Sequence, residues 1–237
     1  MTSTGPAIPT SPASSTAAAL AAAVAEIKPR LRGFLHTYAA AVSIATGASL
    51  IAVAAALRGS RAAAPTAIYA ATVTLLFGTS ALYHRLNWQP KARLLMKRLD
   101  HSMIFVFIAG TYTALAGLSL PRNDAIAVLV VVWTGALFGV ILQTAWRSAP
   151  RWLSAPCYIA LGWVAVFVMP QLLHNAGVAA LVLIVAGGLI YTAGAIVYAT
   201  KKPNPVPGVF GFHEVFHACT LVAASCHYVA VWLAVFS

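Results

Sequence analysis

The sequence predicts an all-α membrane protein, a seven-transmembrane helix bundle with its N-terminus in the cytoplasm and its C-terminus outside. Three observations carry this prediction. Hydrophobic residues make up 61% of the 237 residues and charged residues only 8%, whereas a soluble domain carries about 25% charged residues. Long stretches contain no charged residue at all. These stretches are continuously apolar rather than alternating, which disfavours a membrane β-barrel.

The first 27 residues differ in composition from the rest of the chain. Residues 1–27 are rich in Ala, Ser and Pro, and we expect a disordered or weakly helical tail. They lack the basic start and the continuous apolar core of a signal peptide. Residues 28–237 then form the predicted seven-helix domain, whose first membrane boundary is marked by Lys28, Arg30 and Arg32.

The spans follow from the gaps between charged residues. Five gaps are 21–25 residues long, and about 20 residues suffice to cross a bilayer. A sixth gap, 152–200, has 49 residues, or about 74 Å as one helix. Because it contains the polar breakers Pro170–Gln171 and His174–Gly177, we divide it in two. The predicted helices are roughly 35–57, 64–84, 100–120, 125–146, 152–169, 177–199 and 213–236.

Loop charge predicts the orientation. The N-terminal flank and the loops on its side of the membrane carry 12 basic residues, against 3 on the opposite side. The positive-inside rule therefore places the N-terminus in the cytoplasm. The net charge of +11 is explained by basic loops at an anionic membrane surface, so we expect no nucleic-acid partner.

Small residues predict packing rather than cross-links. Cys219 and Cys226 are seven residues apart, about 10 Å along a helix, too far for a disulfide. We expect all three cysteines to be unpaired. The pair Gly135 and Gly139 has the spacing of a helix-contact face.

Several ionisable side chains lie in or beside the predicted spans, where such groups are costly and usually functional. Helix two ends with Ser80 and His84, helix three begins at Asp100, and helix seven begins with His213 and His217. Given the alternating directions of the helices, all of these residues lie near the cytoplasmic face. The i,i+4 spacing within helices two and seven puts each pair on one helix face.

Two histidines four residues apart plus a third from another helix make a plausible zinc site. We predict His84, His213 and His217 as ligands of Zn²⁺, with a fourth position left for water. Zinc lowers the pKa of bound water toward neutrality and so provides a nucleophile. Asp100 could hydrogen-bond this water or orient a ligand. Ser80 could contact the water or a substrate carbonyl.

The pattern His213-Glu214-x-x-His217 also matches the zinc-protease motif. An intramembrane protease of this kind needs a third ligand, typically an Asp from a later helix, and no Asp follows the motif. Asp124 lies at the wrong depth. We therefore disfavour the protease. For Glu214 two roles stay open, a base at the site or a residue that flanks it at the membrane surface, and we favour the second.

The other histidines are placed outside the triad. His227 is ten residues past His217, about 15 Å along the helix, so it either lines a deeper cavity or bonds a neighbouring helix. His101 points away from Asp100 and is not expected to be a ligand. His36 and His174 lie at opposite membrane boundaries and are interpreted as structural or interfacial.

Taken together, Ser80-x-x-x-His84, Asp100 and His213-x-x-x-His217 resemble the hemolysin III family, the bacterial branch of the progestin and adiponectin receptor family. The resemblance covers roughly residues 30–237. It implies seven helices and an intramembrane zinc held by three histidines, with an Asp and a Ser beside the metal-bound water. The wider superfamily includes alkaline ceramidases, which hydrolyse a lipid amide.

Three functions follow from these residues and this resemblance. The first is a zinc-dependent hydrolase of a lipid amide or ester, with a membrane lipid as substrate and its acyl chain in the bundle cavity. The second is a membrane receptor or sensor with structural zinc. The third is the cytolytic, or hemolytic, activity that the family name implies. The helices show no amphipathic insertion segment, which argues against a dedicated pore-former.

Overall fold

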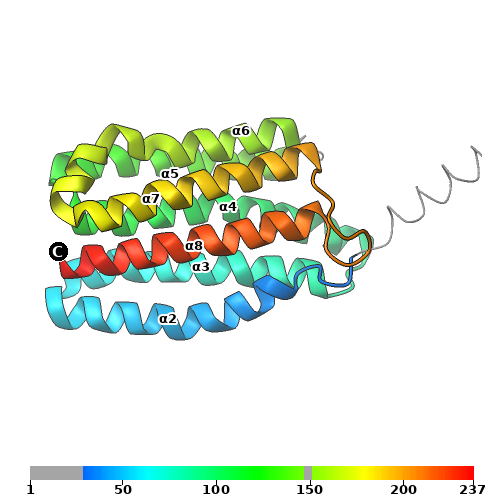
Figure 1. The fold of residues 1–237 in the computed structure, drawn as a ribbon, viewed down its shortest axis with the longest axis horizontal. Coiled ribbons are helices and arrows are strands. Elements are labelled where there is room, and N and C mark those ends of the chain that lie inside the picture. The colour runs from blue at the N-terminus through cyan, green and yellow to red at the C-terminus, as the bar shows by residue number, and fades with distance from the viewer. Residues whose placement is uncertain (1–28, 147–150) are drawn as a thin grey trace, which may run out of the picture.

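The computed structural model describes residues 29–146 and 151–237. The predicted tail, residues 1–27, lies outside the described residues. The helices are α2 (Phe34–Arg58), α3 (Ser60–Arg85), α4 (Pro90–Ser119), α5 (Arg122–Ala145), α6 (Arg151–Gly162), the 3₁₀ helix η1 (Trp163–Val168), α7 (Met169–Thr200) and α8 (Phe212–Phe236). Figure 1 shows them as one elongated bundle of roughly parallel and antiparallel rods.

The all-α prediction is confirmed in the part of the chain that the structure describes. Six helical runs there are long and apolar enough to cross a membrane. One of them is the 49-residue run Trp152–Thr200, and it reverses direction at one end of the bundle in Figure 1. Gly177, in the predicted breaker cluster, has non-helical angles (φ 83°, ψ 169°). Two antiparallel arms therefore occupy this run, and the count of seven spans remains a prediction.

The start of α4 differs most from expectation. The predicted helix began at residue 100, yet α4 begins at Pro90. Proline is favoured in the first turn because no N–H partner is lost there, and the residues that follow it, such as Ala92, Leu94 and Met96, are strong helix formers. The basic residues that seemed to fill a loop, such as Arg93 and Lys97, lie on an extension of the helix.

The helices follow one another around the bundle, and α4 lies nearest its centre. Each helix packs on the next along the chain, and α8 closes the ring by packing on both α7 and α2. α4 is the most buried of the candidate spans and also contacts α6, α7 and α8. Small residues allow this: Gly139 of α5 lies against Phe105 of α4, and Gly135 lies against Leu161 of α6. The predicted contact face of α5 is confirmed.

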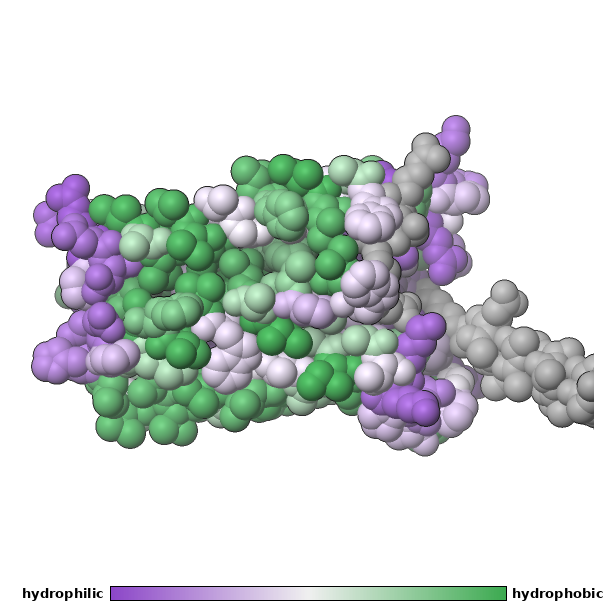
Figure 2. All heavy atoms as spheres, turned by 90° about the horizontal axis from the view of Figure 1, so that it is seen from above, coloured by the Kyte–Doolittle hydropathy of each residue, from purple (hydrophilic) through white to green (hydrophobic). Residues whose placement is uncertain are grey.

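The outside of the bundle is apolar along most of its length. Figure 2 shows a hydrophobic band between two hydrophilic ends. Exposed side chains include Val42, Leu137, Phe138 and Phe167. Apolar patches of this extent are rare on soluble monomers but match the hydrocarbon core of a bilayer. Cys157, Cys219 and Cys226 are free, as predicted.

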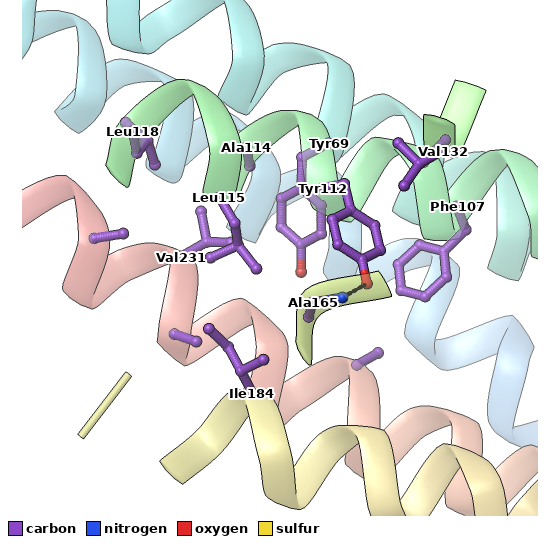
Figure 3. Close-up of a cluster of buried hydrophobic side chains, with 14 of the residues drawn as sticks. Tyr69, Phe107, Tyr112, Ala114, Leu115, Leu118, Val132, Ala165, Ile184 and Val231 are labelled. Atoms are coloured by element: carbon purple, nitrogen blue, oxygen red, sulfur yellow. Dashed lines mark hydrogen bonds between the residues drawn. The ribbon is translucent and has the colours of Figure 1, made fainter. Parts of the chain in front are cut away.

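One buried tyrosine bonds the backbone where α6 continues into the 3₁₀ helix η1. The Tyr112 hydroxyl donates to the carbonyl oxygen of Gly162 (2.6 Å) and accepts from the N–H of Ala165 (2.6 Å). The second contact is drawn in Figure 3. These bonds satisfy backbone groups that a 3₁₀ segment leaves without α-helical partners, which matters because lipid supplies no substitute.

Candidate metal centre

Three buried imidazoles meet at one end of the bundle. His84 lies in the last turn of α3, and His213 and His217 lie in the first two turns of α8. One ligand atom from each lies within 4.8 Å of the other two. The predicted triad thus comes together, from segments 129 residues apart in the chain.

The spacing of these nitrogens fits a tetrahedral metal. Nε2 of His84 and Nε2 of His213 are 3.1 Å apart. Two imidazole nitrogens on one tetrahedral Zn²⁺, each about 2.0–2.1 Å from the ion, are separated by about 3.3 Å. Neutral imidazole is a preferred zinc donor, and three protein ligands are the usual number in catalytic zinc sites. The donor set therefore fits zinc, although the identity of the metal remains a prediction.

Asp100 lies beside the triad. Its Oδ2 is 3.8 Å from Nε2 of His84 and 3.7 Å from Nδ1 of His101. The Ser80 hydroxyl is a hydrogen-bond partner of the same carboxyl. Asp100 and Ser80 therefore both lie close to the imidazole cluster, where their side chains can act on a molecule bound there.

Sequence reasoning missed His36. Its ring stacks on that of His217, with centroids 3.8 Å apart and planes within 9°. Its Nδ1 is 2.8 Å from the Ser80 hydroxyl. Among the described residues its buried Nε2 has no hydrogen-bond partner. The contacts of His36 are those of a structural residue, as interpreted, but the sequence did not reveal that the first turn of α2 lies at the level of the triad.

A glycine brings α2 close to the triad. Gly33 precedes α2 with φ 78°, a left-handed conformation that other residues adopt only with strain. A Cβ at this position would lie 2.6 Å from Cβ of His84. The absence of a side chain at Gly33 therefore lets the start of α2 pack directly against Cβ of His84.

Glu214 flanks the triad without joining it, and it does so as a buried ion-pair partner. It is buried, with 1% of its side chain exposed, and forms an ion pair with Arg32. Its second oxygen, Oε2, accepts a hydrogen bond of 2.8 Å from the N–H of Gly211. Glu214 thus caps α8 and ties it to the segment before α2, because its partner Arg32 is 182 residues away in the chain.

The other histidines lie outside the triad, but His101 does not point away from Asp100 as expected, since its Nδ1 is 3.7 Å from Asp100 Oδ2. His101 is outside the metal-capable group; its Nδ1 lies 2.7 Å from the Lys97 carbonyl, and its Nε2 lies 2.7 Å from the Tyr198 hydroxyl. His174 is exposed. His227 both lines a cavity and contacts a neighbouring helix, α7.

An apolar cavity lies next to the metal-capable cluster. Its volume is about 110 Å³, and it lies between α3, α4, α6, η1, α7 and α8. Phe216 lines its end nearest the triad, with its ring centroid 5.8 Å from His217 and 6.1 Å from His213. One aromatic ring thus separates the cavity from the imidazoles.

The fold and site define a class: a helical membrane protein with a buried His₃ cluster and an adjacent carboxylate. The family model described as Haemolysin-III related matches residues 24–228. The chain belongs to this family, and it is a multi-pass integral protein of the cell membrane. The resemblance inferred from Ser80, His84, Asp100 and the helix-seven histidines is confirmed.

Characterised relatives agree with this assignment. The chain is 33% identical to "Hemolysin-3" of Bacillus cereus over 135 residues, which covers 57% of this chain and 61% of the relative. It is 31% identical to "Hemolysin-3 homolog" of Bacillus subtilis (strain 168), covering 57% and 63%. It is also 39% identical over 109 residues to "Heptahelical transmembrane protein ADIPOR2" of Oryza sativa subsp. japonica, covering 41% and 48%. The chain therefore matches less than two thirds of the length of each of these relatives.

Proposed function

We propose that this protein is a zinc-dependent hydrolase of a lipid amide or ester. The observation that carries the proposal is the buried His84/His213/His217 cluster with a carboxylate oxygen of Asp100 3.8 Å from one of its nitrogens. Asp100 stands beside the donor atoms of the cluster, where its carboxylate can act on a molecule bound at the metal position.

Bound Zn²⁺ would supply a Lewis acid that polarises the substrate carbonyl and makes water acidic. Asp100 Oδ2 then takes a proton from the attacking water as the water oxygen adds to the carbonyl carbon. When the C–N or C–O bond breaks, the same carboxyl returns that proton to the leaving nitrogen or oxygen. The Ser80 hydroxyl, which bonds both His36 and Asp100, holds the carboxyl in place between these two transfers.

The apolar cavity supports a lipid substrate. Its lining is dominated by aliphatic and aromatic side chains from six elements, which suits an acyl chain. Its near end reaches Phe216 beside the imidazoles. A chain lying in the cavity would place the group at its end at Phe216, one aromatic ring from the imidazoles.

The proposal includes the membrane topology. We infer seven spans, because the run Trp152–Thr200 folds back at Gly177, and the rice relative is named heptahelical. With 12 basic residues on one side and 3 on the other, the N-terminus is cytoplasmic and the C-terminus is external. The triad then lies near the cytoplasmic face.

Two variants test the site in purified protein. His217→Ala should abolish the expected one zinc per chain in elemental analysis after dialysis against chelator, whereas His174→Ala, at an exposed position, should keep it. Asp100→Ala should retain most zinc and lose about 10²–10⁴ in hydrolysis rate, the usual value of a general base. Asp124→Ala is the matched control, because Asp124 bonds Gln171 at the other end of the bundle.

The assay is fatty-acid release from a panel of ceramide-like amides and esters, followed by mass spectrometry. A zinc-loaded Asp100→Ala protein as fast as wild type would remove Asp100 from the mechanism. Zinc-loaded wild type that hydrolyses nothing on the panel would favour the receptor with structural zinc. The Bacillus relatives are named hemolysins, so lysis of red cells by the purified protein, without lipid hydrolysis, would favour the cytolytic alternative.

A further inference from the structure

His227 offers an unused acceptor inside the apolar cavity. Its Nε2 is 3.2 Å from the carbonyl oxygen of Ile184 on α7. A carbonyl oxygen only accepts, so Nε2 carries the ring proton and Nδ1 is left with a lone pair. No described residue hydrogen-bonds Nδ1, and His227 is one of the residues that line the cavity.

The packing of α7 on α8 holds this ring in place. A Cβ at Gly187 would lie 2.5 Å from Nε2 and Cδ2 of His227, so only glycine leaves room for the imidazole here. One turn further along α7, the Tyr191 ring meets the His227 ring edge-on, with centroids 5.3 Å apart.

Tyr191 brings an unused donor to the same place. Its hydroxyl is buried and has no hydrogen-bond partner among the described residues, and the hydroxyl of the nearby buried Tyr69 has none either. A buried polar group without a partner costs about 1–3 kcal/mol, and such a group in a native protein calls for an explanation, for example a strained or catalytic role or a bound water, ion or ligand. Figure 3 shows Tyr69 directed into the interior of the bundle. Tyr112 differs in that its own hydroxyl is fully paired.

A free acceptor beside a free donor selects the chemistry of the ligand. A hydroxyl group both donates and accepts through one atom, whereas a carbonyl, an ether or a carboxylate only accepts. We propose that the cavity binds a lipid that carries a hydroxyl group along its chain, with this hydroxyl donating to Nδ1 of His227 and accepting from the phenol of Tyr191. The inference rests on the proposed function for placing the substrate chain in this cavity.

The place of His227 predicts where the hydroxyl lies. His227 is ten residues beyond His217 on the same helix, about 15 Å along its axis. The scissile group at the triad and the hydroxyl are therefore separated by a long run of methylene groups. Hydroxyls next to the head group are too near the triad to reach Tyr191 and His227, so a mid-chain position is required.

Direct binding tests this inference without hydrolysis. Radiolabelled octadecanamide and its mid-chain hydroxylated counterpart are bound to the detergent-solubilised full chain at equilibrium. We expect wild type to bind the hydroxylated amide roughly 3- to 10-fold tighter, the range of a typical net hydrogen bond. An amide hydroxylated next to its head group should bind no tighter than the plain one.

Variants show which residues cause the preference for the hydroxylated amide. Tyr191→Phe and His227→Leu should each reduce it to about twofold or less, and Gly187→Ala should do the same by displacing the His227 ring. Thr111→Val is the matched control, because the Thr111 hydroxyl lines the same cavity but donates to the Phe107 carbonyl of its own helix. It should keep the full preference.

Each outcome decides the case. Equal affinity of wild type for the two probes would overturn the inference and point to water between Tyr191 and His227. A preference that survives Tyr191→Phe, the variant that best preserves shape, would overturn it too. A preference lost in Tyr191→Phe and kept in Thr111→Val supports it, even where the same sample shows no zinc and no hydrolysis, and those two readouts then count against the proposed function alone.

Discussion

The ion pair between Arg32 and Glu214 should contribute strongly to stability, and unequally from its two sides. Breaking a buried pair costs about 3–5 kcal/mol, because one charge is left buried without a partner. Arg32 retains 21% exposure of its side chain and Glu214 only 1%. An orphaned Arg32 can turn toward water, whereas an orphaned Glu214 cannot.

The magnitudes follow from this asymmetry. Glu214→Gln keeps an oxygen for the Gly211 N–H and leaves only Arg32 without an anion, so we expect a loss of about 3 kcal/mol, the low end of that range. Arg32→Met leaves the Glu214 carboxylate buried and should cost about 5 kcal/mol, the high end. The double variant should cost about 3 kcal/mol or less, since removing both charges together is often close to neutral.

The assay is a double-mutant cycle on the free energy of unfolding, measured by denaturant titration in mixed micelles. The single losses sum to about 8 kcal/mol and the double variant loses about 3 kcal/mol at most. The coupling between the two sites should therefore be about 5 kcal/mol or more, well above the 0.3–0.5 kcal/mol within which independent sites add. Additive losses would show that the two charges do not interact. A larger loss for Glu214→Gln than for Arg32→Met would refute the argument from exposure.

Three further predictions concern the site and its surroundings. Gly33→Ala should reduce zinc content and cost about 2–5 kcal/mol, combining positive-φ strain of about 1–2 kcal/mol with overpacking of about 1–3 kcal/mol on His84. Gly59→Ala is the control, because it has the same kind of strain (φ 70°) with nothing within 4 Å of the added Cβ. If thermal-shift measurements gave Gly59→Ala as large a loss of stability as Gly33→Ala, a clash with His84 would not explain the effect. His36→Phe should keep the stack on His217 but lose the bond to Ser80, and hydrolysis should fall about 10-fold or more, the effect of losing an outer-shell partner, at unchanged zinc. A reporter that is active only outside the cytoplasm should be active when fused to the C-terminus. Activity of a cytoplasm-only reporter fused at the same place would contradict the orientation.

Sequence reasoning succeeded where the physics is local. A bilayer demands about 20 apolar residues in each span, so gaps between charges located the helices, and i,i+4 spacing put His213 beside His217. It failed at the start of α4, where basic residues continue a helix instead of ending it. The basic residues were interpreted as a loop because of their charge alone. The helix propensity of the residues after Pro90 would have predicted the earlier start of α4.

The contacts that sequence reasoning missed at the site have a different cause from the early start of α4. Glu214 and His36 are each defined by a partner far away in the chain: Arg32 for Glu214, and Ser80 and His217 for His36. Spacing within one helix carries no information about such contacts. One signal for His36 was nevertheless available. The depth argument that grouped Asp100 with the triad places the first turn of the first helix at the same level.

The closed ring of helices sets an order of events during synthesis. The α8 segment leaves the ribosome after α2 to α7 have been made, and domains form from the N-terminal side as the chain emerges. Two of the three clustered imidazoles, and the anion that neutralises Arg32, arrive with α8. Until then, His84 and Asp100 stand in an unfinished bundle, and α2 has no neighbour on its open side. Contacts of such long sequence separation form late, so insertion of α8 is at once the closing step of the barrel-like ring and the moment at which the chain becomes able to hold a metal.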